Sequence, residues 1–528
     1  MNRRMAPTTA TFQANGRRRK LVETCQAALQ GRRLFLVSNR GPVEHVITHD
    51  GQIKTHRGSG GVVTALAALA QQVELTWIAA AMTEGDRRVA ADPSLSGDSG
   101  ALSARLSVRL LAIPEKVYQR YYNVFSNPLL WFVQHYMLDP AYSTLLVDQS
   151  ARRAWERGYV VANRAFAEKL KDETAGLSQP PVVMVQDYQL YLVAGFAREL
   201  GVNATFQHFV HIPWPAPDYW KFLPHDMRAA ICAGLAANDV VGFQTPDYAR
   251  NFLSSCEEFL DGAIVSHDDQ TIRVDDHICR VRSYPISIDV TGLRRLADSR
   301  AVRRYREELR RRAGEQTIVR VDRLEPSKNI VRGFEAYGNL LERRPELVGR
   351  VKFLAFLVPS RTRLEEYQRY RKAVLDAIER INGRFARPGW QPIEVFYENN
   401  YAQAIAGMSL ADALLVNPIM DGMNLVAKEG PIVNERNGVL VLSEGAGVHH
   451  QLGEAALSVA SGDVEGTADA LYNALVMPEA ERALRLRHLR EAIAAEDLDW
   501  WIRRQFEDLA DLVAVPEQPS EDRLLAVS

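Results

Sequence analysis

The residues best suited to chemistry lie in one stretch, Asn417 to Glu429, which follows the apolar run Ala413 to Val416. The pattern predicts a buried strand, a turn that contains Gly422, and then the start of a helix. Backbone N–H groups at a helix start have no partner within the helix, so they can bind an anion. Asp421 before this helix and Glu429 about two turns along it would place an acid near each end of a bound sugar nucleotide. An ordinary strand-to-helix corner with a solvated glutamate would have the same spacing.

Two other loops have residues that suit phosphate binding. Arg323 and Lys328 flank a proline-containing turn after the apolar run Ile318 to Val321, an arrangement that can grip a diphosphate with charge-assisted hydrogen bonds. Gly60 and Gly61 precede an apolar helical pattern, and glycine allows the backbone to approach a ligand closely. Each feature alone also fits a solvated loop or a flexible hairpin tip.

Asp187 follows the strand candidate Val182 to Val185, and His211 lies at the end of the strand candidate Phe206 to Ile212. In open α/β sheets, ligands bind at the carboxyl ends of the strands, which is where this pattern places both residues. A helix cap for Asp187 and a purely structural role for His211 are the plain alternatives. The aromatic run Tyr121 to Trp131 indicates core packing, with polar tips that can also face a cleft.

Length and composition set the class of protein. A chain of 528 residues is too long for one hydrophobic core, which predicts two or more domains. Lys plus Arg (64) nearly equals Asp plus Glu (65), so no overall charge favours nucleic acid or a membrane surface, and an anion must be held locally. Four cysteines without paired metal spacing indicate reduced thiols in a cytoplasm. No segment reaches the apolar length of a membrane span.

The order of strand and helix patterns predicts the architecture. Two blocks of alternation, near residues 33–285 and 317–455, indicate an α/β protein with two doubly wound Rossmann-like domains that face each other across a cleft. The expected division is a flexible N-terminal tail (1–30), an N-terminal domain (31–290), a C-terminal domain (291–495), and a C-terminal helix that crosses back, followed by a tail (496–528).

A set of short motifs is spread in order over roughly residues 33 to 510. They are Ser38-Asn39-Arg40, Gly60-Gly61, Tyr121-Tyr122-Asn123 with Trp131, Asp187-Tyr188, His211-Ile212-Pro213, Gly242-Phe243-Gln244-Thr245, Arg323 with Ser327-Lys328, Ser360-Arg361, and Asp421-Gly422-Met423-Asn424-Leu425-Val426-Ala427-Lys428-Glu429. This ordered set resembles the trehalose-6-phosphate synthase family of retaining glycosyltransferases. Each motif is weak alone, and the order in which they occur carries the resemblance.

The resemblance implies a GT-B fold and an enzyme that moves a glucosyl unit from a nucleotide sugar to a sugar phosphate. The expected reaction is trehalose 6-phosphate synthesis from UDP-glucose and glucose 6-phosphate, in the cytoplasm and without nucleic acid or membrane partners. No cofactor and no metal are expected, because Arg323 and Lys328 would supply the positive charge at the diphosphate. Members of the family often self-associate, so a homo-oligomer is compatible with the resemblance.

The resemblance also assigns the site residues. The expected catalytic residues are Arg323, Lys328, Asp187, His211 and Asp421. The expected donor-binding residues are Gly60, Gly61, Arg323, Lys328, Asp421, Gly422, Met423, Asn424, Leu425, Val426 and Glu429. The expected acceptor-binding residues are Arg40, Tyr122, Trp131, Asp187, Tyr188 and Arg361. No residue is assigned to a metal.

The chain departs from the family pattern around the sugars. Trp77-Ile78-Ala79-Ala80 stands where the family usually has a Trp-Phe-Gly-Trp-like run, so an indole on the acceptor side is missing. Gln186 and Gln189 stand where histidines are common. The usual Leu-Asp-Tyr-Ser-Lys-Gly reads Leu324-Glu325-Pro326-Ser327-Lys328-Asn329, and Met420 replaces a frequent arginine. These changes keep the phosphate-binding residues and alter the walls around the sugars.

The departures keep three alternatives open. The altered motifs are similar to the branch that contains validoxylamine 7'-phosphate synthase, which couples a cyclitol nucleotide to an aminocyclitol phosphate. Glucosylglycerol-phosphate synthase is a relative with a smaller acceptor. A protein of another class, a non-catalytic sugar-phosphate sensor, would bind the ligands without turnover. The sequence does not fix the acceptor or the nucleotide base.

Overall fold

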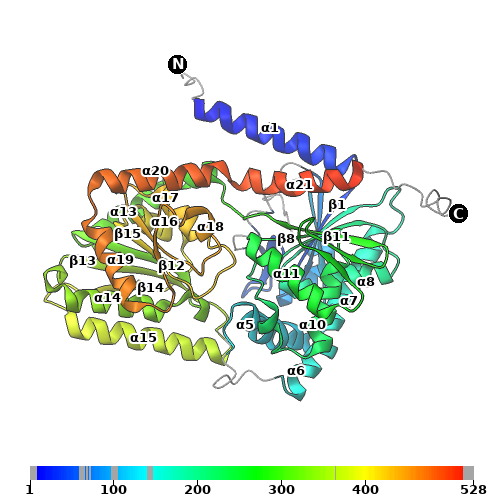
Figure 1. The fold of residues 1–528 in the computed structure, drawn as a ribbon, viewed down its shortest axis with the longest axis horizontal. Helices are drawn as coiled ribbons and strands as arrows, with labels where there is room; N and C mark the ends of the chain where they lie inside the picture. The colour runs from blue at the N-terminus through cyan, green and yellow to red at the C-terminus, as the bar shows by residue number, and fades with distance from the viewer. Residues whose placement is uncertain are drawn as a thin grey trace.

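In the computed structural model, residues 9–58, 63, 66, 69–70, 73–96, 105–138, 147–362 and 364–514 are described. They form two lobes that lie side by side, each built on its own sheet with helices against it (Figure 1). The N-terminal lobe contains the first sheet and the C-terminal lobe the second. The two lobes are those expected from the two blocks of strand and helix alternation.

The sheet of the N-terminal lobe has nine strands in the order β5-β4-β1-β6-β7-β8-β11-β10-β9. Neighbours from β5 to β11 are parallel, and β9 and β10 add an antiparallel edge. Continuous apolar runs suit such strands because helices bury both faces of a parallel sheet. The strands are β1 (Leu34–Ser38), β4 (Leu75–Ala80), β5 (Leu106–Leu111), β6 (Val182–Gln186), β7 (Thr205–Phe209), β8 (Val240–Phe243), β9 (Ile264–Ser266), β10 (Thr271–Val274) and β11 (His277–Ser283). A separate hairpin pairs β2 (Val43–Ile47) with β3 (Ile53–Arg57).

The sheet of the C-terminal lobe is parallel throughout, with six strands in the order β14-β13-β12-β15-β16-β17. The chain order reverses between β12 and β15, and a crevice opens at such a point in doubly wound sheets. The strands are β12 (Gln316–Arg323), β13 (Val351–Val358), β14 (Ile393–Phe396), β15 (Ala413–Val416), β16 (Val439–Ser443) and β17 (Leu457–Val459).

Helices connect the strands of both lobes. Those before residue 290 are α1 (Thr9–Leu29), α3 (Glu84–Ala91), α4 (Glu115–Tyr118), α5 (Trp131–Gln134), α6 (Gln149–Ala154), α7 (Val160–Thr174), α8 (Val193–Glu199), α9 (Pro217–Trp220), α10 (His225–Ala236) and α11 (Pro246–Phe259). Those after it are α12 (Val290–Ala297), α13 (Arg300–Arg310), α14 (Ile330–Arg343), α15 (Glu365–Phe385), α16 (Tyr401–Ser409), α17 (Val426–Val433), α18 (His449–Leu452), α19 (Val464–Val476), α20 (Glu479–Ala495) and α21 (Leu498–Ala514).

Short 3₁₀ and π segments complete the chain. They are η1 (Pro93–Ser96), η2 (Gln119–Leu130), η3 (Trp155–Tyr159), η4 (Tyr188–Leu190), η5 (Pro326–Lys328) and η6 (Pro345–Leu347). The aromatic run predicted to pack in the core lies mostly in the π-helical η2, which contains Pro128. Wide π turns are rare and are found mostly at functional sites.

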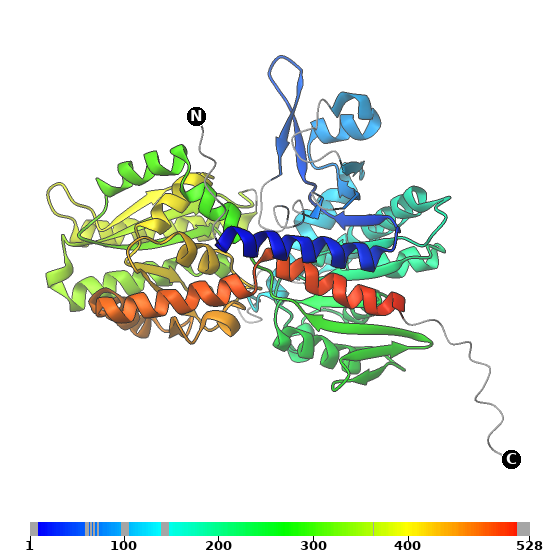
Figure 2. The same cartoon turned by 90° about the horizontal axis from the view of Figure 1, so that it is seen from above.

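The N-terminal segment differs from the expected flexible tail. Thr9–Leu29 forms helix α1, which lies along α21 in both views (Figures 1 and 2). Its buried residues Leu21, Cys25, Ala28 and Leu29 recur at helical spacing and form one apolar stripe. The charged residues around this stripe gave the segment its tail-like composition, and the stripe becomes stable only when α21 covers it.

Helix α21 crosses from the C-terminal lobe back onto the N-terminal lobe (Figure 2). The indole of Trp501 is fully buried and donates from Nε1 to the carbonyl of Tyr284 at 3.2 Å. The Tyr284 hydroxyl donates to Asp508 at 2.5 Å, and Gln207 bonds Gln505 at 3.1 Å. The C-terminal helix therefore joins the two lobes on the side where the chain crosses between them. No helix in the described part of the chain is long and apolar enough to cross a membrane.

We predict that Trp501→Ala destabilises the protein by about 3–5 kcal/mol, because it removes a buried indole and leaves a cavity between α21 and the sheet. Denaturant unfolding of the full chain measures the change as a lower transition midpoint. Val476→Ala, at a side chain that is 53% exposed, is the matched control and should leave the midpoint nearly unchanged. Equal midpoints for the two variants would mean that α21 does not stabilise the fold.

Candidate active site

Charged residues from both lobes gather where strands end. Arg323 ends β12, Arg361 follows β13, and Asp421 follows β15, while Asp187 and His211 follow β6 and β7 of the other lobe. The two sets meet, because the Arg361 guanidinium donates to the Tyr188 hydroxyl at 3.1 Å. The structure therefore brings the predicted donor and acceptor halves together.

The turn before α17 forms the expected helix start. Asn424 adopts a left-handed backbone (φ 82°), and its Oδ1 accepts the N–H of Ala427 at 3.1 Å. The helix begins at Val426, so Glu429 lies in its first turn and not two turns along, as the sequence suggested. The amides of Met423 to Val426 come before the bonds of the helix itself, which leaves this end free for an anion.

Gly422 lies at a close backbone contact between the lobes. A Cβ at this position would lie 2.0 Å from the carbonyl oxygen of His211. Beside it, the Tyr248 hydroxyl of the N-terminal lobe donates to the carbonyl of Asp421 at 3.1 Å. Only glycine allows the turn to sit this close to the end of β7.

Lys328 and Asp421 form an ion pair beneath this turn. Lys328 Nζ donates to Asp421 Oδ2, which also accepts from Asn424 Nδ2 at 3.1 Å. The side chains are only 12% and 17% exposed. Burial raises the pKa of Asp421, but the charge and hydrogen bond of Lys328 outweigh burial, and the pKa ends below its usual value. Asp421 is therefore a carboxylate with a fixed orientation.

Arg323 lies beside this pair and remains open to a ligand. Its side chain is 58% exposed, and its Nη1 lies 3.2 Å from Oε1 of the fully buried Glu325. A guanidinium has five N–H donors, so one contact with Glu325 leaves most of them available. Arg323 and Lys328 together supply two positive charges at the carboxyl end of β12.

Arg361 carries the positive charge on the acceptor side. Its guanidinium donates to Tyr188 and Tyr367, and its Cζ lies 4.9 Å from the ring centre of Trp131. Trp131 is itself buried and stacked on His135 at 4.0 Å. The Trp131 indole therefore supports the arginine from below and does not stand free in the cleft.

The remaining acceptor residues sit nearby on the N-terminal lobe. Tyr122 is half-buried and stacks on Tyr118 with ring centres 5.4 Å apart. The Arg40 side chain is exposed after β1. Its neighbour Asn39 donates to the Tyr118 hydroxyl at 3.3 Å, so this loop lies beside the tyrosine pair. The positions of Tyr122 and Arg40 are compatible with the phosphate-binding role predicted for them.

Asp187 is held in an unusual backbone conformation at the end of β6. Its φ is 72°, and its Oδ1 accepts the N–H of His211 at 3.2 Å. Burial raises the pKa of Asp187 to about 6, against the opposing effects of backbone N–H bonds and of the positive charges of Arg361 and Arg323. The carboxyl group thus faces the same cations that would bind the substrates.

His211 is buried, and burial together with His208 lowers its pKa to about 3. Its Nε2 lies 2.9 Å from Gln186 Oε1, and its Nδ1 lies 3.4 Å from Gln244 Nε2. The ring is therefore neutral and enclosed by two glutamines. The structure places His211 beside the cleft as a wall residue, and the catalytic role expected for it stays a prediction.

Glu429 accepts the hydroxyl of Tyr401 at 2.8 Å. Burial raises the pKa of this carboxyl group to about 7, although the Tyr401 bond acts in the other direction. Gly60 and Gly61, the expected loop over the donor, lie outside the described residues.

Sequence reasoning missed Tyr367, Tyr401 and Glu325. Each lies shortly after a strand of the second sheet ends, which is the position that marks ligand sites in such folds. Tyr367 and Tyr401 lie at the starts of α15 and α16, so the helical pattern concealed them. Glu325 was visible only as a change from the usual aspartate of the family.

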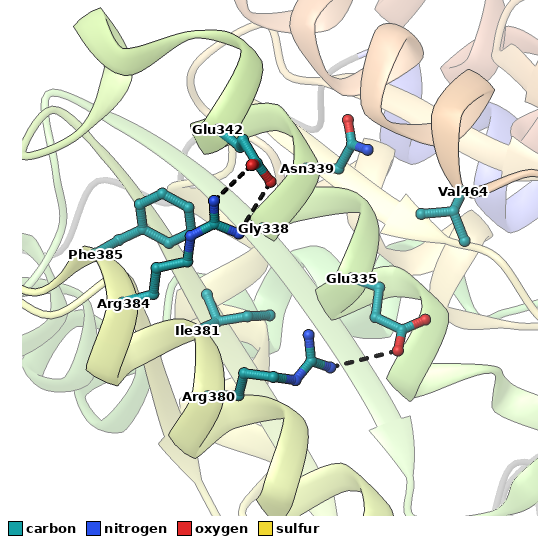
Figure 3. A pocket seen from close by; sticks show the side chains of 9 residues that line it. All are labelled: Glu335, Gly338, Asn339, Glu342, Arg380, Ile381, Arg384, Phe385 and Val464. Atoms are coloured by element: carbon teal, nitrogen blue, oxygen red, sulfur yellow. Dashed lines mark hydrogen bonds and ion pairs between the residues drawn. The ribbon is translucent and has the colours of Figure 1, made fainter.

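A separate groove of about 490 Å³ lies between α14 and α15, away from the strand ends that carry the site (Figure 3). Its arginines are already paired, Arg380 with Glu335 and Arg384 with Glu342. The apolar side chains of Ile381 and Phe385 complete the lining. Both ion pairs join α14 to α15, so this groove is a separate feature of the C-terminal lobe.

Two Rossmann-like lobes with facing cations and carboxylates at their strand ends define a GT-B glycosyltransferase. The comparison with protein families agrees, since the model described as "Glycosyltransferase family 20" matches residues 32–511. The chain belongs to this family, which includes the trehalose-6-phosphate synthases, and it is a glycosyltransferase.

Characterised relatives cover nearly the whole chain. The trehalose-6-phosphate synthase of Mycobacterium marinum is 34% identical over 493 residues, which span 90% of this chain and 93% of the relative. The UDP-forming alpha,alpha-trehalose-phosphate synthase of Schizosaccharomyces pombe is 32% identical over 467 residues, or 86% of each chain. The family resemblance is confirmed by these matches.

Solved structures show the same fold. A structure from E. coli bound with UDP-2-fluoro glucose is 28% identical, has a TM-score of 0.75, and covers 90% of this chain and 99% of its own. The UDP-forming alpha,alpha-trehalose-phosphate synthase of Burkholderia xenovorans in complex with glucose-6-phosphate is 29% identical, with a TM-score of 0.75 and the same two coverages. The GT-B prediction is confirmed.

We predict that Gly422→Ala lowers kcat/KM by on the order of 10²-fold, because the added Cβ pushes the turn before α17 away from His211 and misplaces the groups around it. Steady-state kinetics of the purified variant measure the loss. Gly462→Ala is the matched control, since a Cβ there has open space. A Gly422→Ala enzyme with the same kcat/KM as Gly462→Ala would show that the close contact is not needed.

Proposed function

We propose that this chain transfers glucose with retention from UDP-glucose to glucose 6-phosphate and forms trehalose 6-phosphate. The observation that carries the proposal is the arrangement of cations. Arg323 and Lys328 lie beside the turn before α17, and Arg361 donates a hydrogen bond to Tyr188 of the N-terminal lobe. A cluster of positive charge that extends from the turn before α17 to the N-terminal lobe suits two phosphate-bearing substrates held side by side. The relatives described as UDP-forming trehalose-phosphate synthases support the same donor and acceptor.

On the donor side, Arg323 and Lys328 bind the diphosphate, and the amides of Asn424, Leu425 and Val426 assist at the positive end of the helix. Asp421, with Gly422 and Met423, orients the hexose, and Glu429 accepts the ribose hydroxyls. Gly60 and Gly61 belong to the loop that closes on the donor. The role of Gly60 and Gly61 follows from the family resemblance, and the other roles follow from the charge and position of each group.

On the acceptor side, Arg361, Arg40 and Tyr122 bind the phosphate, with Trp131 and Tyr188 supporting Arg361. Asp187 accepts the sugar hydroxyls beside the donor, since its Oδ1 faces the end of β7. The cleft therefore holds the acceptor hydroxyl next to the anomeric carbon.

The anomeric configuration is retained because the acceptor oxygen attacks the anomeric carbon from the same face that UDP leaves. The bond between the anomeric carbon and the UDP oxygen breaks, the bond to the acceptor oxygen forms, and the departing phosphate oxygen takes the acceptor proton. The enzyme positions both substrates and stabilises the negative charge that develops on UDP, which is the task of Arg323 and Lys328. Asp421 is engaged by Lys328 and Asn424, which favours this route over attack by a free carboxylate nucleophile.

Two further properties belong to the proposal. Arg323 and Lys328 supply the charge that a metal would otherwise supply, so the reaction needs no metal ion. We place the enzyme in the cytoplasm, because its four cysteines are unpaired and buried and unpaired thiols persist in a reducing compartment.

The proposal predicts that the protein releases UDP when given UDP-glucose and glucose 6-phosphate, with or without a chelator. The assay offers UDP-, GDP- and ADP-glucose and a cyclitol nucleotide against glucose 6-phosphate, glycerol phosphate and an aminocyclitol phosphate, and measures released nucleoside diphosphate. NMR of the product reports the anomeric configuration. Release only with an aminocyclitol or glycerol phosphate would assign the chain to the other branches, and binding without release would identify a sensor.

The donor affinity should depend on pH through Glu429. Its carboxylate form accepts ribose hydroxyls, and its pKa is raised to about 7 by burial, so the KM for UDP-glucose should fall about tenfold as the pH rises through about 7. Tyr401→Phe removes a bond to the carboxylate, which should raise the pKa of Glu429 and move the midpoint to higher pH. Tyr397→Phe, at another partly exposed tyrosine of the same lobe, is the control. Identical profiles for all three proteins would remove Glu429 from donor binding.

A further inference from the structure

Glu325 is a buried carboxylate at the centre of the positive charges. Its side chain is fully buried at the end of β12, and Oε1 accepts from Ser360 Oγ at 2.7 Å and faces Arg323 Nη1 at 3.2 Å. Oε2 is buried without a hydrogen-bond partner among the described residues. A buried carboxylate is costly unless it is paired, so its position indicates that the surrounding cations need it.

The charge state of Glu325 agrees with this position. Burial raises the pKa of Glu325, but the positive charges of Arg323, Arg361 and Lys328 outweigh burial and lower the pKa to about 2. The group is therefore ionised whenever the enzyme works. It offsets the mutual repulsion of three cations that lie together before any substrate is bound.

The first link from Glu325 leads to the donor side. The ion pair with Glu325 is the contact that the structure gives the exposed Arg323 guanidinium within the described residues. One contact at Nη1 fixes the orientation of the planar Arg323 guanidinium. The other N–H groups remain available to donate to two phosphate oxygens. Without it, a long exposed side chain would sample several rotamers.

The second link leads to the acceptor side. Ser360, which donates to Glu325, directly precedes Arg361, and Arg361 has a left-handed backbone (φ 43°) that non-glycine residues rarely adopt. The N–H of Leu364 closes the same turn on the carbonyl of Arg361 at 3.0 Å. The Ser360 bond therefore holds the start of a turn that aims Arg361 at Tyr188.

We propose that Glu325 is a positioning residue shared by both substrates: it directs Arg323 to the donor diphosphate and, through Ser360, fixes the turn that carries Arg361 to the acceptor phosphate. The inference rests on the proposed donor and acceptor binding sites and adds a physical connection between them. Because Glu325 orients both Arg323 and Arg361, the positions of the donor and acceptor phosphate sites depend on the same carboxylate.

Glu325→Gln tests the proposal, because it keeps the shape of the side chain and removes its charge. The expected result is a rise of about tenfold in the KM for UDP-glucose and also in the KM for glucose 6-phosphate. Glu325→Asp, which restores the carboxylate usual in the family, should recover part of both losses. Glu335→Gln is the matched control, because Glu335 pairs with Arg380 in the groove of Figure 3, and both KM values should stay unchanged.

Ser360→Ala separates positioning from general support of the fold. It cuts only the acceptor link, so it should raise the KM for glucose 6-phosphate several-fold and leave the KM for UDP-glucose near that of the unmodified enzyme. Equal effects of Ser360→Ala on both substrates, or no effect of Glu325→Gln on either, would overturn the proposal. If Glu325→Gln does not fold, Ser360→Ala and Glu325→Asp provide the same comparison.

A direct binding measurement keeps this inference distinct from the proposed reaction. Calorimetry measures the affinity of UDP-glucose for the unmodified chain and for the variants without any turnover. If the unmodified chain binds UDP-glucose but releases no UDP with any acceptor, the proposed reaction fails. Weaker binding to Glu325→Gln in that experiment would still support the donor link, and equal binding would refute it.

Discussion

The confinement of like charge in the cleft is the constraint on which the rest of the site depends. Arg323, Lys328 and Arg361 come from two neighbouring strand ends, and their mutual repulsion would drive such side chains apart in a low-dielectric site. Glu325 pairs with Arg323 and Asp421 pairs with Lys328, so each carboxylate holds a cation in place. Both carboxylates remain ionised because the cations outweigh the cost of burial. A phosphate that enters then finds cations whose directions are already fixed, which lowers the entropy lost on binding.

A second constraint is the close backbone contact between the lobes. Gly422 lies against the carbonyl of His211, and Gly447 in turn lies against the carbonyl of Gly422, so no side chain separates the three segments. Nearby, the buried Lys428 donates to the carbonyl of Ile286 at 2.8 Å, in the segment that connects the lobes. Helix α17 is thus bonded to the segment between the lobes through its first turn. Because backbone contacts tolerate little displacement, they fix the spacing of the two lobes at this point.

The sequence predicted the fold well where local patterns agree with tertiary structure. The limits of β15 were predicted without error and those of β6 to within one residue, because buried parallel strands are continuous apolar runs. Helix α1 was missed because its apolar stripe packs against α21, which lies nearly 500 residues later in the sequence. The ion pair of Lys328 with Asp421 joins predicted residues, but no pattern states that Arg361 reaches Tyr188 of the other lobe. Contacts of that kind depend on how two domains pack, and a single sequence does not encode them locally.

The departure at Gln186 shows how the neighbouring wall residue His211 can be fixed without a charge. The backbone N–H of Ile286 can only donate, and it bonds Gln244 Oε1 at 2.9 Å, so the amide nitrogen of Gln244 must face His211 Nδ1. Nδ1 is then an acceptor, and the proton lies on Nε2, where it is donated to Gln186 Oε1. The imidazole is neutral, with its single proton committed to a glutamine and not to a substrate. A general base at this position would have to break that bond, so the geometry favours a reaction in which the departing phosphate takes the proton and the protein supplies position and charge.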